Sequence, residues 1–264
     1  MTPERATMSD GPKLSVRGVT IGIGGRTLCR NLDIDVHAGD IWAIVGPNGA
    51  GKTTLVATLA GLRSSVAGSI AYDGRPLDAL TPRARALTRG YLPQDSVDFF
   101  PASVLDTVLV GRHPHLARWR WESAADIESA RAALAAFGLD TFAARDVRTL
   151  SGGERRRVAL AALVAQDPAL LLLDEPSSHL DLGQQIAALD VIAALAHERG
   201  KSIVMVLHDL HLAARYADHA IAMGNGNATC GPVGDILTDD ALSSLFAHRL
   251  TSVGTGRSRA FVPE

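Results

Sequence analysis

One short segment combines a glycine-rich turn with a lysine and a hydroxyl group. It fits the pattern G-x-x-x-x-G-K-[ST] and consists of Gly46, Pro47, Asn48, Gly49, Ala50, Gly51, Lys52 and Thr53. A loop of this kind turns its backbone N–H groups toward phosphate oxygens, and the following helix directs its positive end at them. Lys52 would reach the terminal phosphates, and the Thr53 hydroxyl would bind magnesium. A chance glycine turn is the alternative, but a strand expected before the segment and a helix expected after it favour a phosphate site.

Two acidic residues follow the apolar run at residues 170–173. Asp174 would hold magnesium, directly or through water, and Glu175 would orient and polarise an attacking water molecule. Taken alone, two acids after a strand are more often a helix cap and a first-turn charge. The phosphate loop in the same chain favours the catalytic interpretation.

The letters LSGGE at residues 150–154 predict the start of a helix. Ser151 and Glu154 have the S-x-x-E spacing of a capping box, in which each side chain accepts a hydrogen bond from the other residue's backbone N–H. This purely local interpretation predicts a helix over residues 154–166.

Local capping leaves two features of this helix start unexplained. Gly152 and Gly153 occupy the first turn, where glycine lowers stability relative to alanine. Arg155, Arg156 and Arg157 put positive charge where the helix dipole favours negative charge. Both features make sense if this helix end closely approaches an anion. Because the chain already has one phosphate loop, we expect the second site to serve a different phosphate ligand.

The elements that must position these residues are short apolar runs, typical of parallel strands buried on both faces. In open α/β sheets, ligands bind beyond the carboxyl ends of the strands, so polar residues at those ends should meet at one edge. Each of four runs is followed by such residues: 41–45 by Gly46, 90–93 by Gln94, 170–173 by Asp174 and Glu175, and 203–207 by His208.

The remaining segments complete an α/β pattern with a parallel sheet. Two alternating runs predict half-buried strands at residues 16–21 and 32–36, and Asp73-Gly74 predicts a hairpin turn after residues 69–72. Helices are expected at residues 123–137, 154–166, 184–198, 210–217 and 238–248. The 264-residue chain has a net charge of -2, which argues against nucleic-acid binding through bulk electrostatics. It contains no uninterrupted apolar run of the roughly 18 residues that a membrane span needs.

Taken in order, the phosphate loop, Gln94, LSGGE, LLLLDE, Asp181 and His208 resemble the ATP-binding-cassette (ABC) ATPase family over roughly residues 14–220. The resemblance implies an α/β fold with a mostly parallel sheet core, an N-terminal antiparallel β subdomain and an inserted helical subdomain. Residues 1–12 are expected to be a flexible tail and residues 13–250 a single ABC ATPase domain. Within that domain, residues from about 95 to 165 would form the helical subdomain with LSGGE, and residues 251–264 a C-terminal tail.

The same resemblance implies a reaction and a set of roles. The ligands would be ATP and Mg2+, and two copies would pair head to tail, so that LSGGE of one chain closes over ATP held by the other. Ser151 and Gly153 would then contact the γ-phosphate in trans, Gly152 belongs to the same set of ATP-binding residues, and Asp181 would line the seam between the copies. Gln94 would contact magnesium and water, and His208 would steady the γ-phosphate and attacking water. The residues assigned to ATP also include Thr54, directly after the phosphate loop.

One position departs from the family pattern. The family usually places an aromatic ring on the adenine, contributed by the N-terminal strand region. Ile23 stands at about that position, and no Phe, Trp or Tyr precedes Trp42. An apolar contact can replace part of the stacking, so the selectivity for the base stays open.

A narrower resemblance concerns the segment at residues 110–116 (VGRHPHL) and the letters YLPQ at residues 91–94. Both are similar to ATPases of importers for iron–siderophores, haem and cobalamin. This implies transmembrane permease subunits as partners, an indirect link to a substrate-binding protein, and a position on the cytoplasmic face of the inner membrane. The permease would dock around residues 94–116, where the apolar Phe99, Phe100 and Pro101 suit a docking groove. A role of these three residues in the core fits the sequence equally well. A solvated loop or a chance H-x-H pattern is the alternative for Arg112–His115.

Two other kinds of ABC protein stay open at this point. One is a soluble ATPase without transport, such as those that resemble iron–sulfur assembly factors. The other is a nucleic-acid or translation-associated ABC protein. Those proteins generally carry two cassettes or a long coiled-coil insertion, and this chain has neither.

Overall fold

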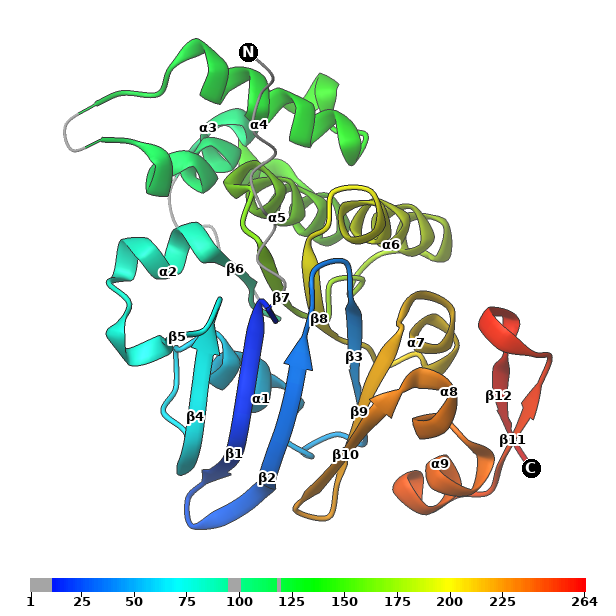
Figure 1. Cartoon of the computed structure of the whole chain (residues 1–264). Helices are drawn as coiled ribbons and strands as arrows, with labels where there is room; N and C mark the ends of the chain where they lie inside the picture. Colours follow the sequence, from blue (N-terminus) through cyan, green and yellow to red (C-terminus); the bar gives the residue numbers. More distant parts are fainter. Residues whose placement is uncertain (1–10, 95–100, 118–119) are drawn as a thin grey trace, which may run out of the picture.

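The structure is a computed structural model that describes residues 11–94, 101–117 and 120–264. Most of the expected N-terminal tail, as well as Phe99 and Phe100 of the expected docking groove, lies outside the described residues. Figure 1 shows strands gathered at one end of the molecule and helices α3 (Val104–Leu109), α4 (Ala124–Ala136) and α5 (Gly152–Gln166) at the other.

The central element is a six-stranded sheet with the order β10-β9-β3-β8-β7-β6. Neighbours from β9 to β6 run parallel, and only β10 runs antiparallel to its neighbour. The strands are β3 (Ile41–Val45), β6 (Arg89–Leu92), β7 (Leu170–Asp174), β8 (Ser202–Val206), β9 (His219–Gly224) and β10 (Asn227–Pro232). The four strands predicted from apolar runs are therefore confirmed, and they belong to one sheet.

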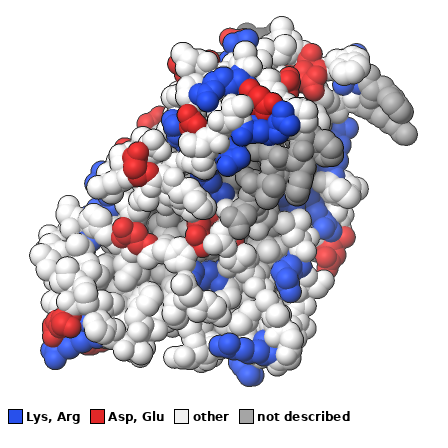
Figure 2. All heavy atoms as spheres, turned by 180° about the vertical axis from the view of Figure 1, so that it is seen from behind, with Lys and Arg blue, Asp and Glu red and all other residues white. Residues whose placement is uncertain are grey.

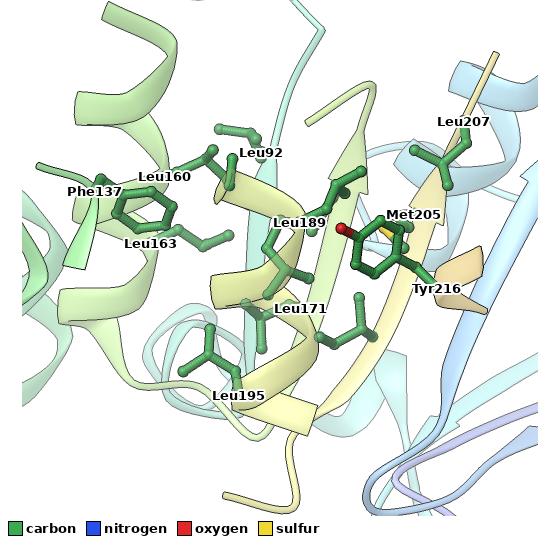
Figure 3. Packing of buried hydrophobic residues seen from close by; sticks show 14 of the residues in the cluster. Leu92, Phe137, Leu160, Leu163, Leu171, Leu189, Leu195, Met205, Leu207 and Tyr216 are labelled. Carbon is green, nitrogen blue, oxygen red and sulfur yellow. The ribbon is translucent and has the colours of Figure 1, made fainter. Parts of the chain in front are cut away.

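The central strands are buried on both faces because successive side chains enter two different cores. On β7, Leu171 and Leu173 pack into one core, whereas Leu170 and Leu172 pack into the other. The first core joins the sheet to the helical part of the chain, through residues such as Leu160 of α5 and Leu189 of α6 (Leu182–His197). Figure 3 shows this core, with Leu171 and Met205 of the sheet close to Leu189 and Tyr216.

The second core lies between the six-stranded sheet and an antiparallel sheet with the order β2-β1-β4-β5. Its strands are β1 (Leu14–Ile23), β2 (Arg26–Val36), β4 (Ala67–Tyr72) and β5 (Arg75–Pro76). Helix α1 (Lys52–Leu59) contributes Leu55, Val56 and Leu59 to the same core. The predicted antiparallel N-terminal sheet and the hairpin at Asp73 are confirmed, and β1 and β2 are longer than the sequence indicated.

The C-terminal segments are regular elements as well. Helices α7 (Leu210–Tyr216), α8 (Val233–Ile236) and α9 (Asp239–Phe246) flank β9 and β10, and β11 (Leu250–Val253) pairs with β12 (Ala260–Pro263). His211 of α7 contacts the backbone oxygen of Arg259 at 2.9 Å, and Arg257 binds the Asp218 carboxylate at 2.9 Å. Residues 251–264, expected from the sequence to be a tail, are thus attached to the helix that follows His208.

Short elements complete the chain. Helix α2 (Pro82–Thr88) leads into β6, and short 3-10 helices occur at Leu77–Ala79, Val110–His115, Asp140–Phe142, Val147–Thr149 and Gly256–Ser258. No helix within the described ranges is both long and apolar enough to cross a membrane. On the face seen in Figure 2, basic side chains crowd the helical end with acidic ones among them, while the middle is largely uncharged.

Candidate functional site

The phosphate loop joins β3 to α1 through a turn that requires glycine. Gly46 has φ 149°, and a Cβ there would lie 2.1 Å from the backbone oxygen of Met223 on β9. Gly51 precedes α1 with φ 100° and provides no side-chain cap. The first N–H groups of α1 are therefore left for a ligand, as in anion sites at helix N-termini.

Lys52 is held inside this loop. Its side chain is buried, and Nζ donates hydrogen bonds to the backbone oxygens of Gly46 at 2.7 Å and Pro47 at 3.0 Å. Burial lowers the pKa of Lys52, while the negative charges of Glu175 and Asp174 act in the opposite direction. The loop thus surrounds an ammonium group whose hydrogen-bond acceptors are backbone oxygens, and phosphate oxygens could take their place.

Asp174 ends β7 with a carboxylate that suits a cation. It is completely buried, and neither carboxylate oxygen has a hydrogen-bond partner of standard geometry among the described residues. Burial raises the pKa of Asp174, and the nearby Thr53 hydroxyl opposes that rise. Two bare carboxylate oxygens beside a hydroxyl are hard oxygen ligands, the kind that Mg2+ prefers, and Mg2+ usually keeps several waters and phosphate oxygens besides. Thr53 and Asp174 therefore fit a magnesium ion bound together with phosphates.

Glu175 connects the ends of three strands. Its Oε1 accepts a hydrogen bond from Gln94 Nε2 at 3.0 Å, after β6, and lies 2.6 Å from His208 Nε2, after β8. The backbone of Glu175 has φ 52°, a left-handed conformation that is uncommon for a residue with a side chain and costs energy. The position of these residues at the carboxyl ends of predicted parallel strands predicted that they would meet, and the structure brings them together.

A cavity of about 600 Å³ unites these groups. Its volume is in the usual range for small-molecule sites. Its lining includes the phosphate loop, Gln94, Glu175 and His208, together with Ile23, Arg26 and Leu28 of the β1–β2 hairpin. Ile23 is 47% exposed, although it is apolar. The sequence placed Ile23 here but missed Arg26 and Leu28, because only the pairing of β1 with β2 brings them to the cavity.

The LSGGE segment forms the predicted capping box at the start of α5. Ser151 Oγ accepts a hydrogen bond from the Glu154 N–H at 3.2 Å, and Glu154 Oε2 accepts one from the Ser151 N–H at 2.7 Å. A Cβ on Gly153 would lie 3.0 Å from the backbone oxygen of His179, so this glycine allows close packing against the segment before α6. Asp181 caps α6 by accepting a hydrogen bond from the Gln184 N–H at 2.8 Å.

The two predicted phosphate sites are separate within one chain. Within the described ranges, the residues around the 600 Å³ cavity include neither the LSGGE glycines nor Ser151 or Asp181. Ser151 is exposed at the N-terminus of α5 and is available to a ligand outside this cavity.

The arginines after LSGGE do not act as a group. The sequence suggested that all three favour an anion, but Arg156 is buried and points away from the helix end toward backbone oxygens of the β6 and β7 ends. The burial of Arg156 could have been predicted from the sequence, because Arg156 lies on the same helical face as Leu160 and Leu163, at i+4 and i+7. Arg157 binds the backbone oxygen of Phe137 at 3.0 Å instead.

Residues 110–116 form a second, apolar groove rather than a metal site. Arg112 binds Asp126 of α4 at 2.9 Å and the backbone oxygen of Ala165 of α5 at 2.8 Å, and His115 contacts the Gln166 oxygen. No group of three or more His, Cys, Asp or Glu able to hold a metal occurs in the described part of the chain. The groove, of about 470 Å³, is lined by residues that include Tyr91, Pro93, Val110, Gly111, Pro114 and Val158.

Comparison with known proteins places this site in a family. The family model described as ABC transporter matches residues 29–178. The chain is 37% identical to a cobalamin import ATP-binding protein of Halobacterium salinarum, over 92% of this chain and 60% of that protein. It therefore spans less than two thirds of that relative's length. It is 42% identical to a hemin import ATP-binding protein of Nocardia farcinica, over 89% of this chain and 83% of the relative.

A solved structure agrees with these relatives. An inward-facing metal-chelate type ABC transporter superposes with a TM-score of 0.83 and 30% identity, over 96% of this chain and 97% of the solved chain. The matches in sequence and in fold thus cover nearly all of this chain, and they confirm the family and the fold class expected from the motifs. The chain belongs to the ABC transporter family.

Proposed function

We propose that this chain is the ATP-hydrolysing subunit of an importer for a metal chelate such as haem, a ferric siderophore or cobalamin. The observation that carries the proposal is the convergence of Gln94 and His208 on Glu175, beside the loop that holds Lys52. The substrate class follows from the relatives, whose names specify import of hemin and cobalamin.

In this proposal, the triphosphate of ATP lies on Gly46–Thr54 with the base toward Ile23 and Arg26. Lys52 turns from the Gly46 and Pro47 oxygens to the β- and γ-phosphates. Thr53 and Asp174 hold Mg2+, which when bound neutralises charge that develops on the phosphates. Glu175 accepts the proton of the attacking water, which Gln94 helps to orient. His208 Nε2 donates to a γ-phosphate oxygen and so steadies the group that is transferred.

The second phosphate site implies that two copies of the chain act together in the proposed function. Because Ser151 and the two glycines after it lie outside the cavity of their own chain, they serve ATP bound to a second copy. A symmetric head-to-tail pair places two such sites at one interface, with Asp181 near the seam. ATP binding then closes the pair, and hydrolysis lets it open.

Mixing two inactive variants tests this two-chain site. Ser151→Arg blocks the contribution to the partner's ATP, and Glu175→Gln removes the base of a chain's own site. Each variant alone should hydrolyse ATP poorly, whereas a 1:1 mixture should regain activity, because each mixed pair contains one intact site. Absence of any regain, with both variants folded and binding ATP, would show that one chain forms a complete site.

The apolar groove beside residues 110–116 is the proposed contact with the membrane-spanning subunits. Its lining is mostly apolar, with Val110, Pro114 and Val158, and it also includes Arg89 and Arg155. It lies at the end of β6, where Gln94 reaches the ATP site. A permease segment seated there can sense ATP through Gln94. The proposal accordingly includes a position on the cytoplasmic face of the membrane and a substrate-binding protein as an indirect partner.

Affinity purification from detergent-solubilised membranes tests this partner. The wild-type chain should retain a permease, and Val110→Asp should release it without loss of ATP binding. A substrate-binding protein encoded or purified alongside it would identify the chelate. Recovery of a stable soluble complex with iron–sulfur assembly proteins, and no membrane subunit, would support the alternative ATPase without transport.

A further inference from the structure

Arg156 places a positive charge in the interior, directly behind the catalytic residues. It is the fifth residue of α5, counted from Gly152, and only 4% of it is exposed. An arginine is rarely buried without partners, because removing its charge from water is costly. The partners of Arg156 therefore indicate what the residue does.

The guanidinium donates hydrogen bonds to backbone oxygens at the ends of two neighbouring strands. After β6, Nη1 donates to Pro93 at 2.6 Å and to Gln94 at 3.2 Å. After β7, Nη2 donates to Asp174 at 2.5 Å and to Glu175 at 2.6 Å. Nε donates to Pro176 at 3.4 Å. Among the described residues, the guanidinium thus reaches five backbone oxygens at once, a pattern that the single ammonium of lysine cannot reproduce.

These bonds begin where the sheet ladder ends. The last paired residues of β6 and β7 are Leu92 and Leu173, and beyond them Pro93 has no N–H with which to continue the ladder. Arg156 joins the two backbones at that point from the side of α5. It also fixes the backbone of Glu175, whose left-handed conformation is disfavoured unless its surroundings impose it.

We infer that Arg156 is a positioning residue that makes the alignment of Gln94 and Glu175 depend on helix α5. Its guanidinium holds the backbones of the two residues whose side chains meet 3.0 Å apart in the ATP cavity. The same helix begins at Ser151, which in the proposed function binds the partner chain's ATP. A shift of α5 when the two chains close therefore moves Gln94 and Glu175 through Arg156.

This inference rests on the proposed function and makes a prediction specific to one chain. Arg156 acts on the catalytic base of its own chain, whereas Ser151 acts on the ATP of the partner. Arg156→Gln should therefore lower kcat by about tenfold to a hundredfold, because small displacements of reacting groups cost that much. The Kd for ATP should stay within about twofold, since the phosphate loop is untouched. Arg156→Lys should also be impaired, because it keeps the charge but loses the fork.

A matched control is available one residue away. Arg157→Gln removes the same side chain from the same helix but breaks a bond to Phe137 rather than bonds to the site. It should retain wild-type kcat. Wild-type kcat in both Arg156 variants would overturn the inference, as would equal losses in the Arg156 and Arg157 variants.

Mixing experiments separate positioning of Glu175 from simple damage to α5. Arg156→Gln mixed 1:1 with Ser151→Arg should recover about a quarter of wild-type turnover, because half of the pairs are mixed and each has one intact site. Mixed with Glu175→Gln it should recover none, because both variants fail in their own chain. No recovery with Ser151→Arg would mean that Arg156 supports the signature helix, and the inference would be wrong.

The mixture of Ser151→Arg with Glu175→Gln, measured in parallel, separates a failure of the two-chain site from a failure of the positioning role of Arg156. If that mixture also fails to regain activity, the two-chain site is wrong, and the comparison of Arg156 with Arg157 still tests the positioning role. If only the Arg156 mixtures depart from expectation, the two-chain site stands and the positioning role fails.

Discussion

The Nε2 atom of His208 lies 2.6 Å from Oε1 of Glu175, although the two residues are 33 positions apart. They meet because β7 and β8 are parallel neighbours whose ends reach the same edge of the sheet. Gln94 binds the same carboxylate oxygen from the end of β6. Glu175 is thus the residue on which the other catalytic candidates converge, and its substitution should separate binding from hydrolysis.

Glu175→Gln should retain ATP binding and lose at least about a hundredfold in turnover, as expected for removal of a general base. The amide keeps the size of the side chain and its contact with Gln94, so the fold and the phosphate loop should be unaffected. Phosphate release and nucleotide binding measured on the same preparation check this. Glu198→Gln, at the exposed end of α6, is the control and should behave as wild type. Turnover near the wild-type rate in Glu175→Gln would remove Glu175 from the role of base.

Lys52→Ala should weaken ATP binding about tenfold to a hundredfold, the usual effect of removing a charge-assisted hydrogen bond. The ammonium lies among loop oxygens that will repel phosphates once it is gone. Isothermal titration with ATP and with inorganic tripolyphosphate should show the same loss, because the contact is to phosphate and not to the base. Lys201→Ala, which breaks an ion pair with Asp167, is the matched control. Unchanged affinity in Lys52→Ala would contradict the phosphate-loop assignment.

Ile23→Tyr should tighten ATP binding about fivefold or more, because an aromatic ring at the mouth of the cavity adds stacking on the base. Tripolyphosphate affinity should stay constant, which separates a contact with the base from a change in the loop. The affinities for ATP and for GTP should increase by similar factors, since stacking distinguishes bases poorly. Ile127→Tyr, at an exposed position on α4, controls for the added ring. A gain confined to tripolyphosphate, or none for ATP, would place the base elsewhere.

Asp126→Asn should lower the free energy of unfolding by about 1–2 kcal/mol at pH 7. Hydrogen bonds from Ser123, with a further one from Arg112, lower the pKa of Asp126 to about 2. Since the folded pKa lies below the ordinary value of 3.8, the stabilisation is complete above that value. It is lost as the pH falls through about 2, below which the carboxylate is protonated in both states.

Urea unfolding of wild type and Asp126→Asn at a series of pH values checks this behaviour. The difference in the free energy of unfolding between the two proteins should be constant near neutral pH and shrink below about pH 4. Asp106→Asn loses a similar cap contact with Ser103 at the start of α3, and that contact includes no arginine. It should lower the free energy of unfolding by less than Asp126→Asn does. A difference that grows on acidification would contradict the assigned direction of the pKa shift.

The sequence alone determined the buried strands that end at the site and the helix that begins after Ser151. Short apolar runs predicted the buried strands because a parallel strand needs apolar side chains on both faces, and the polar residues after them marked the edge that carries the site. The capping box at Ser151 was equally local, since its hydrogen bonds span only three residues. The family followed from the order of these motifs, which is a property of the chain itself.

Only the tertiary structure decided which side chains share a contact. The burial of Arg156 and its five backbone partners depends on how α5 packs against β6 and β7. Arg26 reaches the cavity through strand pairing in a different sheet. The C-terminal residues looked like a tail because β11 and β12 are short, and they are ordered by contacts with α7 and Asp218. Each of these relationships joins segments far apart along the chain, where periodicity and spacing carry no information.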